Sequence, residues 1–314
     1  MEILPGIHHV RFPLAPRVWG AFYVLTGRRP AVIDTGKPDT PSQFLFPYLR
    51  KLGLPLKAIV LIVTTHRHLD HAGGNASVRK IVPIPIAAHR VEAPFLEDPW
   101  REVEEVRFRY PDDHPYRGLD RAQIMTKLLT SVPVDIQLED GDEVELGDRR
   151  WQIVHSPGHC SGIICLFDSR TGTLLASDSF QAGGTVDGIA IYDDLQAYMQ
   201  SLDRIQALGP QKLIVAHPFR PFYKPLFQGE EVAEFLAACR HFPSEYDREL
   251  IEILREQHRP RSLGWITDVM RVLHSCYGPR FLTVVTLRTH LDRLTAIGIL
   301  RQESFGGHLA WMHT

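Results

Sequence analysis

The stretch Thr65-His66-Arg67-His68-Leu69-Asp70-His71-Ala72-Gly73-Gly74 gathers three histidines and one aspartate within a short turn. It comes just after the apolar run 58–63. Imidazole nitrogen and carboxylate oxygen are ligands that zinc, manganese and iron accept. The pattern H-x-H-x-D-H therefore indicates a metal site. A solvated polar loop is the alternative interpretation, and further ligands elsewhere in the chain would exclude it.

Three more polar side chains stand at the ends of apolar runs or in tight turns. His159 lies in H-S-P-G-H-C-S-G after the strand-like segment 150–154, Asp178 follows 172–177, and His217 follows 212–216. Loops at strand ends allow a rigid sheet to direct side chains into a shared cleft. Seven candidate ligands are too many for one zinc ion but suit two metal ions.

The ordered set of H-x-H-x-D-H, P-G-H, a strand-terminal aspartate and a late histidine resembles the metallo-β-lactamase superfamily of hydrolases. The segment Ile33-Asp34-Thr35-Gly36 also matches that family, and the resemblance extends from about the N-terminus to about residue 225. It implies an α/β fold, the αββα sandwich, with a dinuclear metal site at one edge. The ligands that it implies are His66, His68 and His159 for one metal ion, Asp70, His71 and His217 for the other, and Asp178 as the bridge between them.

Two departures from the family pattern concern the loops around the ligands. Ser177 stands before Asp178, and Pro218 follows His217, at positions where many members have glycine. Neither change removes a ligand. Both affect the local loop shape and therefore the expected substrate.

Composition limits the remaining possibilities. The 314 residues suffice for one large domain and a small one, and 44% hydrophobic and 23% charged residues are typical of a globular protein. A net charge of −2 gives no overall attraction to nucleic acid or to an anionic membrane. The N-terminal segment 1–6 lacks the basic and apolar regions of a signal peptide, and no apolar run approaches transmembrane length. Four cysteines without C-x-x-C spacing fit a reducing compartment, so we expect a cytoplasmic protein with no membrane partner.

The pattern of apolar residues and turn formers predicts alternating strands and helices. The expected helices are 43–52, which ends at Gly53, and 195–208. The expected strands are 7–12, 21–26, 30–34, 58–63, 144–146, 150–154, 163–167, 173–176 and 212–216.

We divide the chain into a catalytic domain, residues 1–228, and a C-terminal domain, residues 229–314. The first contains a charged, aromatic insertion at about 91–131 with a helix-like stretch at 122–129. This insertion has two interpretations: a lid that selects substrates over the metal site, or a surface excursion that packs on itself or forms a dimer contact.

The C-terminal domain is expected to be small, α+β and similar to a winged helix. Its expected elements are helices at 249–257, 263–276 and 284–297 and a hairpin formed by 299–302 and 308–312. A subgroup of the superfamily that includes endoribonuclease-like members carries such a unit. If the unit of this chain bound nucleic acid, Arg288 and Arg293 of its third helix would contact phosphate. The tail after Phe242 has nine arginines, no lysine and eight acidic residues, and so lacks the basic face of a nucleic-acid binder. We therefore favour a packing or oligomerisation element, which includes a homodimer, over a nucleic-acid partner.

Three functions follow from this sequence. The favoured one is a hydrolase with two divalent metal ions, zinc first and manganese or iron as alternatives, whose metal-bridging hydroxide attacks a small ester, thioester or lactone. Asp178 would hold the ions at a fixed separation. Asp70 would ligate the second ion or, if that position were empty, act as a general base. The second is an endoribonuclease or phosphodiesterase whose C-terminal domain holds RNA. The third, a redox or scaffold use of the fold, is opposed by the full ligand set.

Other residues near these motifs have structural alternatives. Asp34 would orient a ligand histidine or cap the turn at Thr35 and Gly36. Tyr192 or Tyr198 would stabilise an oxyanion or pack in the core. For the remaining side chains we expect packing or structural roles only: Cys160, His8, His9, His89 and His155.

Overall fold

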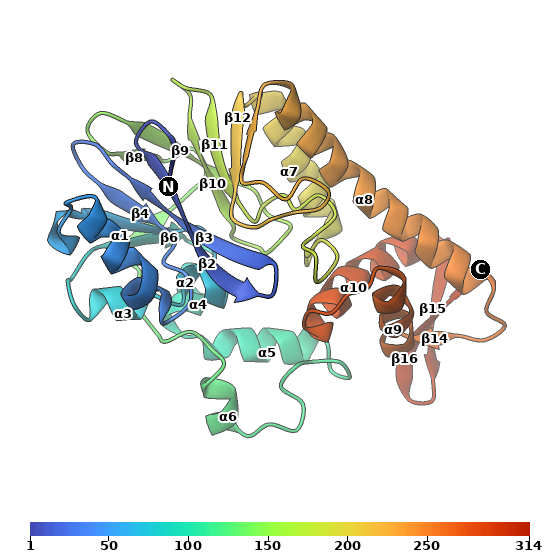
Figure 1. The fold of residues 1–314 in the computed structure, drawn as a ribbon. Coiled ribbons are helices and arrows are strands. Elements are labelled where there is room, and N and C mark those ends of the chain that lie inside the picture. Colours follow the sequence, from blue (N-terminus) through green and yellow to red (C-terminus); the bar gives the residue numbers. More distant parts are fainter.

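A computed structural model describes residues 1–314, and two β-sheets form its centre (Figure 1). The first sheet has seven strands in sequence order, antiparallel from β1 to β4 and parallel from β4 to β7. Its strands are β1 Glu2–Leu4, β2 Ile7–Ala15, β3 Val18–Leu25, β4 Ala31–Ile33, β5 Leu61–Thr64, β6 Ile86–His89 and β7 Ile136–Leu138.

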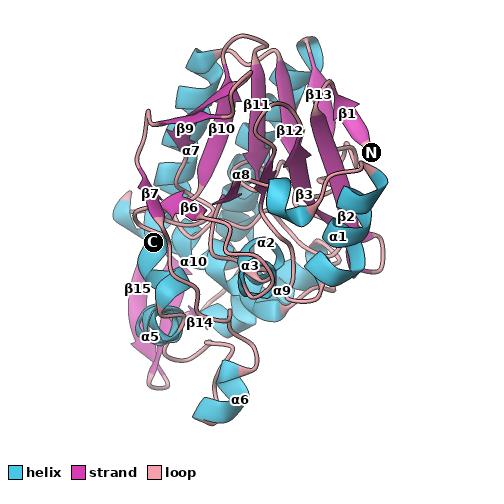
Figure 2. Ribbon diagram, turned by 90° about the vertical axis from the view of Figure 1, so that its left-hand side faces the viewer, coloured by secondary structure: helices cyan, strands magenta, loops and turns pink.

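The second sheet has six strands in the order β13-β12-β11-β10-β9-β8, and only the β11–β12 pair is parallel. Its strands are β8 Glu143–Glu145, β9 Arg150–His155, β10 Ile164–Asp168, β11 Thr173–Ser177, β12 Lys212–Val215 and β13 Leu226–Gln228. In Figure 2 the strands of both sheets occupy the upper part of the molecule.

Four layers result from how the sheets bury their faces. Between the sheets lies a core of 16 buried residues, with Tyr23 and Val63 from the first sheet and Trp151 and Leu166 from the second. The outer face of the first sheet packs against α1 Phe46–Lys51 and α3 Asn75–Arg79. The outer face of the second sheet packs against α7 Leu195–Leu208 and α8 Glu230–Arg255. The predicted αββα sandwich is confirmed.

Capping residues and prolines determine where the helices of the sandwich begin and end. Helix α7 has the predicted bounds because the side chain of Asp194 caps its N-terminus and Gly209, at φ +65°, ends it. The predicted helix 43–52 is instead a π-helical turn, Pro41–Leu45, followed by the short α1. Pro47 lies in the first turn of α1, where its missing N–H costs nothing.

The insertion contains three short helices: α4 Ala93–Glu97, α5 Trp100–Arg109 and α6 Arg121–Met125. Helix α6 begins with a capping box between Asp120 and Gln123, and it ends before the predicted residue 129. Figure 2 shows α5 and α6 below the two sheets.

The C-terminal part contains the second and third predicted helices, with shifted ends, and the predicted hairpin, with which a short strand pairs. Its elements after α8 are β14 Arg261–Ser262, α9 Leu263–Leu273, α10 Arg280–Ala296, β15 Leu300–Phe305 and β16 His308–His313, with the strands in the order β14-β16-β15. The likeness to a winged helix stays a prediction. No helix of the chain combines the length and the apolar character that a membrane crossing requires.

The prediction that the first C-terminal helix begins at Glu249 is wrong. Helix α8 begins at Glu230 and continues through Pro243 to Arg255. An interior proline costs about 3 kcal/mol of helix stability, but Phe235 and Cys239 of this helix are buried in the core of the second sheet. Tertiary packing therefore outweighs the local disruption. Figure 1 shows α8 extending from the sandwich to the C-terminal part.

Candidate metal centre

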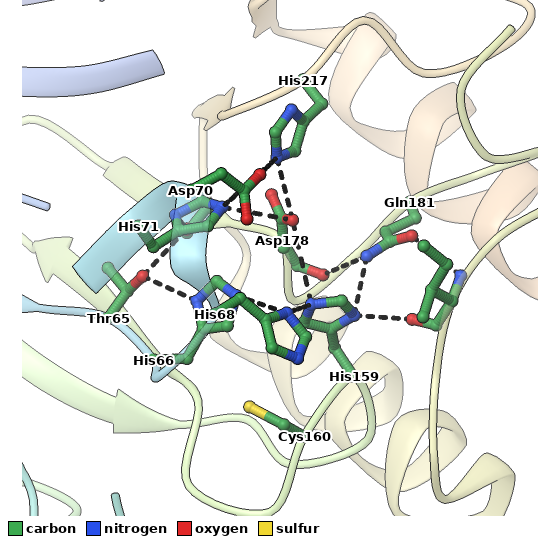
Figure 3. Close-up of polar contacts among 12 residues, drawn as sticks. Thr65, His66, His68, Asp70, His71, His159, Cys160, Asp178, Gln181 and His217 are labelled. Carbon is green, nitrogen blue, oxygen red and sulfur yellow. Dashed lines mark hydrogen bonds and ion pairs between the residues drawn. The ribbon is translucent and has the colours of Figure 1, made fainter. Parts of the chain in front are cut away.

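The seven predicted ligands meet at one edge of the sandwich (Figure 3). They come from the segments that follow four strands of the two sheets. His66 and His68 follow β5, with Asp70 and His71 in the next helix, α2 Leu69–Ala72; His159 lies between β9 and β10; Asp178 follows β11; and His217 follows β12. Residues that are far apart in the sequence thus form a single cluster, because the ends of these strands lie at the same edge of the sandwich.

His66, His68 and His159 form the first predicted ligand group. His68 Nδ1 lies 3.1 Å from His66 Nε2 and 2.9 Å from His159 Nε2. Zinc–nitrogen bonds of 2.0–2.1 Å in a tetrahedral site place two ligand nitrogens about 3.3 Å apart. The three nitrogens therefore fit one divalent ion, with His68 using Nδ1 and the other two using Nε2.

Asp70, His71 and His217 form the second group. The Nε2 atoms of His71 and His217 are 3.3 Å apart. Asp70 Oδ2 lies 3.4 Å from His217 Nε2 and 3.7 Å from His71 Nε2. One carboxylate and two imidazoles at these separations suit a second ion with an open position.

Asp178 lies between the two groups. Its Oδ2 atom is 3.0 Å from His217 Nε2, 3.4 Å from His71 Nε2 and 3.8 Å from His159 Nε2. Its Oδ1 atom is buried without a hydrogen-bond partner. An orphaned buried carboxylate oxygen is costly unless a cation satisfies it. The position fits the predicted bridge, although the ligand roles themselves stay predictions.

Backbone carbonyl groups fix the orientation of two ligand rings. The Nδ1–H of His159 donates to the carbonyl oxygen of Ile191 at 2.7 Å, and that of His217 donates to the carbonyl oxygen of Trp19 at 3.0 Å. With Nδ1 protonated, the lone pair of each ring lies on Nε2 and is free to bind a metal ion.

Asp34 orients the rings of His71 and, through Thr65, His66. Its Oδ2 accepts a hydrogen bond from His71 Nδ1–H at 2.8 Å and another from the Thr65 hydroxyl at 2.8 Å. The same hydroxyl lies 3.0 Å from His66 Nδ1 and accepts its proton. Asp34 is fully buried. The interpretation of Asp34 as an orienting residue therefore agrees with the structure.

The electrostatics of the cluster favour a cation. Burial and the neighbouring imidazoles lower the pKa of His66 and His68 well below the usual range, so both rings are neutral. Burial would also lower the pKa of His71, but Asp178, Asp70 and Asp34 together raise it well above the usual value. Burial opposes the ionisation of Asp178, yet His217 and His71 hold its pKa well below the usual range. The negative charge that keeps a proton on His71 would equally attract a divalent ion, which would release that proton.

The two departures from the family pattern are accommodated. Ser177 has φ +47°, a left-handed conformation that glycine adopts more easily. Its hydroxyl lies 3.0 Å from the Thr65 hydroxyl, which gives this strained residue a buried hydrogen bond. Pro218 is buried directly after His217.

A cavity of about 490 Å³ opens from the cluster. Besides five of the ligands, its walls come from the β2–β3 hairpin, the insertion and the start of α10. Leu14 and Val18 of the hairpin, Val106 of α5 and Phe281 of α10 are among the lining residues. The insertion thus lies over the cavity, as the lid interpretation requires.

Ion pairs fasten α5 to the cluster. Arg67, which lies between two ligands, is buried and bonds Glu92 at 2.8 Å. It also lies 3.6 Å from Glu105 of α5. At the other end of α5, Arg109 pairs with Asp193 at 3.1 Å. Burial raises the pKa of Asp193 to about 6, despite the opposing effect of Arg109. Sequence reasoning missed these pairs, because their members are far apart in the chain.

Most of the other residues singled out near the motifs lie outside the ligand groups and the cavity. Tyr192 and Tyr198 are fully buried, and Tyr192 bonds His290 at 2.6 Å, so both pack in the core and neither faces the cavity. Cys160 is buried and is among the residues that line the cavity, so its packing role stays a prediction. The rings of His89 and His155 stack on each other 4.1 Å apart, outside the ligand groups.

Comparison with known proteins identifies the family. The sequence family described as the metallo-beta-lactamase superfamily matches residues 20–217. The "Beta-lactamase-like protein 2 homolog" of Drosophila melanogaster is 30% identical over 287 residues, which cover 88% of this chain and 82% of that protein. The chain therefore belongs to the metallo-β-lactamase superfamily, and the family prediction is confirmed.

Two further relatives show what the similarity covers. The "Acyl-coenzyme A thioesterase MBLAC2" of Bos taurus is 29% identical over 157 residues, 49% of this chain and 53% of that protein. The match thus spans about half the length of that relative. The crystal structure of a metallo-β-lactamase family protein from Thermus thermophilus superposes with a TM-score of 0.79 over 100% of both chains at 21% identity. This similarity shows the fold of the whole chain, including its C-terminal part.

Proposed function

We propose that the protein is a hydrolase that uses two divalent metal ions, zinc first, to cleave a carboxylic ester, thioester or lactone of a small molecule. The observation that carries this proposal is the cluster of seven candidate ligands that opens directly into the cavity. Membership of the superfamily supports a metal-dependent hydrolase. The thioesterase activity in the name of the bovine relative supports a substrate with a reactive carbonyl group.

The residues of the chain have distinct tasks in this reaction. Two ions bound at the cluster would supply an activated water molecule and a Lewis acid for the carbonyl oxygen. Asp178 holds Oδ2 between the two ligand groups and so sets their separation. Asp70 lines the cavity with a side chain that is 26% exposed. It would ligate the second ion or, if that position were empty, its carboxylate would act as a general base. Arg67 and Glu92 hold the ligand loop rigid beneath these groups.

A nuclease is the weaker alternative because the arginines that would contact phosphate are engaged. Arg288 donates from Nε to both carboxylate oxygens of Asp292 at 2.9 Å. Arg293 forms an ion pair with Asp247. Each guanidinium group is thus already paired with a carboxylate, which weakens its attraction for a phosphodiester backbone, and the C-terminal part is nearly neutral in charge.

The first experiment measures the metal content of the purified protein together with its turnover of a substrate panel. The panel contains an aryl ester, a thioester, a lactone, a phosphodiester and a single-stranded RNA. We expect two metal ions per chain and cleavage of the carbonyl substrates. We also expect His68→Ala and Asp178→Ala to abolish turnover and to lower the bound metal.

The control is His241→Ala, which changes an exposed histidine of α8 outside the cluster. It should retain the metal and the activity of the wild type. Full metal content and activity in both His68→Ala and Asp178→Ala would exclude the proposed site. Cleavage of the phosphodiester or RNA alone would favour the nuclease.

A further inference from the structure

The cavity beside the metal centre has an apolar part built from two segments that are distant in the sequence. Val106 and Tyr110 of the insertion line it on one side, and Phe281 and Val285 of α10 line it on the other. The rings of Tyr110 and Phe281 meet edge to face with centroids 5.2 Å apart, so the two walls are in contact. Figure 1 shows α5 and α10 adjoining below the sandwich. The volume of about 490 Å³ lies within the range of small-molecule sites.

Charged groups of the walls are largely neutralised within the protein. Arg67 is held by Glu92 and Glu105, and Arg109 is held by Asp193. Arg67 cannot bind an anionic substrate without breaking its buried pair with Glu92, which is costly. Arg109 is partly exposed but is already paired with Asp193. The remaining cations of the lining are Lys127, which is exposed, and Arg271. Glu102 and Asp187 also line the cavity and would repel an anion. The apolar part between α5 and α10 therefore suits an uncharged group.

We propose that this part of the cavity is an acyl-chain site and that the substrate is an ester or thioester of a hydrophobic carboxylic acid. The chain lies between α5 and α10, and Val106 and Val285 determine how long it can be. The inference rests on the proposed function, because it names the substrate class of the same site. We assign the acyl half because the thiol carriers of biological thioesters are polar, so only the acid half matches apolar walls.

Burial of apolar surface gives the expected size of the effect. Each buried methylene group contributes about 0.8 kcal/mol, which corresponds to roughly a fourfold change in kcat/KM. A site of this kind should therefore distinguish a short acyl group from a longer one until the cavity is filled.

The test uses the metal-loaded enzyme and p-nitrophenyl acetate, butyrate, hexanoate and octanoate, which share one leaving group. We expect kcat/KM to rise at least roughly tenfold from acetate to hexanoate. Val285→Phe fills the cavity and should lower the ratio of kcat/KM for octanoate to kcat/KM for acetate by roughly tenfold or more. Val272→Phe is the matched control, because Val272 is exposed on α9 and does not line the cavity.

A binding measurement gives a second readout that does not depend on turnover. The ligands here are the free carboxylates, not the esters. Calorimetry should show that the octanoate ion binds the wild type more tightly than the acetate ion does, and that Val285→Phe removes the difference in affinity. If circular dichroism shows that Val285→Phe is misfolded, Val106→Phe fills the cavity from the opposite wall.

Each contrary outcome has a separate meaning. Turnover of all four esters at equal kcat/KM would overturn the acyl-chain site and leave the hydrolase intact. If neither these esters nor the thioester and the lactone of the first panel are cleaved, the proposed function fails, and equal binding of octanoate and acetate would then overturn the acyl-chain site as well. A series of alkyl acetates with a steeper chain-length dependence than the acyl series would show that the cavity binds the alcohol half, which also overturns the assignment.

Discussion

At the scale of single residues, Asp34 controls the ligands that it touches without facing the cavity itself. It accepts the Nδ1 proton of His71, and it fixes Thr65 through the backbone N–H at 2.7 Å and through the hydroxyl. Thr65 in turn orients His66. One buried carboxylate thereby orients one ring in each of the two ligand groups so that its Nε2 atom points toward the expected metal position.

We predict that Asp34→Asn lowers metal affinity by about 10–100-fold, the usual cost of losing a group that orients a ligand. The amide is neutral and cannot accept hydrogen bonds at both positions, so His71 loses its fixed tautomer. Competition with a chelator measures the affinity. The control is Asp39→Asn, an exposed change whose side chain bonds only Gln43. If Asp34→Asn binds metal as tightly as the wild type does, Asp34 merely caps the turn.

The site was predictable to the extent that its residues are local in sequence. His66, His68, Asp70 and His71 occupy one turn, so their spacing alone indicated a metal nest. The cavity walls could not be found in this way. Val285 reaches the same cavity only after α10 packs against the insertion, and no sequence spacing encodes that approach.

At the scale of elements, a loop connects the metal centre to the C-terminal part. Ile191 accepts the Nδ1 proton of His159, and the next residue, Tyr192, donates its hydroxyl proton to His290 of α10 at 2.6 Å. His290 in turn donates from Nδ1 to Asp247 of α8 at 2.8 Å. Two C-terminal helices therefore hold the loop that orients a candidate ligand.

We predict that Tyr192→Phe destabilises the protein by about 1–3 kcal/mol, because it leaves the fully buried Nε2 of His290 unpaired. Urea unfolding measures the change. The matched control is Tyr198→Phe, a fully buried tyrosine whose ring centroid lies 4.8 Å from that of Tyr192 and whose hydroxyl has no partner. That variant should lose little or no stability. Equal losses in both variants would show that the hydrogen bond to His290 is unimportant.

The elements also show what limits prediction at this scale. Helix α7 was predictable because Asp194 and Gly209 mark its two ends within the sequence. The start of α8 was not, because Pro243 suggests a helix break, which is outweighed by the packing of α8 residues such as Phe235 and Cys239 in the core of the second sheet.

At the scale of the whole molecule, the C-terminal part shares its core with the sandwich. One cluster of 36 buried residues includes Leu213 and Phe227 of the second sheet and Val284 and Trp311 of the C-terminal part. The accessible surface is 13794 Å², close to the ~13,300 Å² that a compact monomer of 35.7 kDa should expose. The two parts therefore form one body rather than two loosely joined units.

This continuity leads to a prediction about unfolding. We expect a single cooperative transition in which helical circular dichroism, tryptophan fluorescence and metal release coincide. A chain ending at Gln228 should aggregate, because it would expose Leu213 and Phe227, which α8 and its neighbours cover. The division of the chain at residue 228 would then describe its sequence pattern and not its folding. Two separate transitions, or a folded and monomeric 1–228 fragment, would instead show that the C-terminal part is an independent domain.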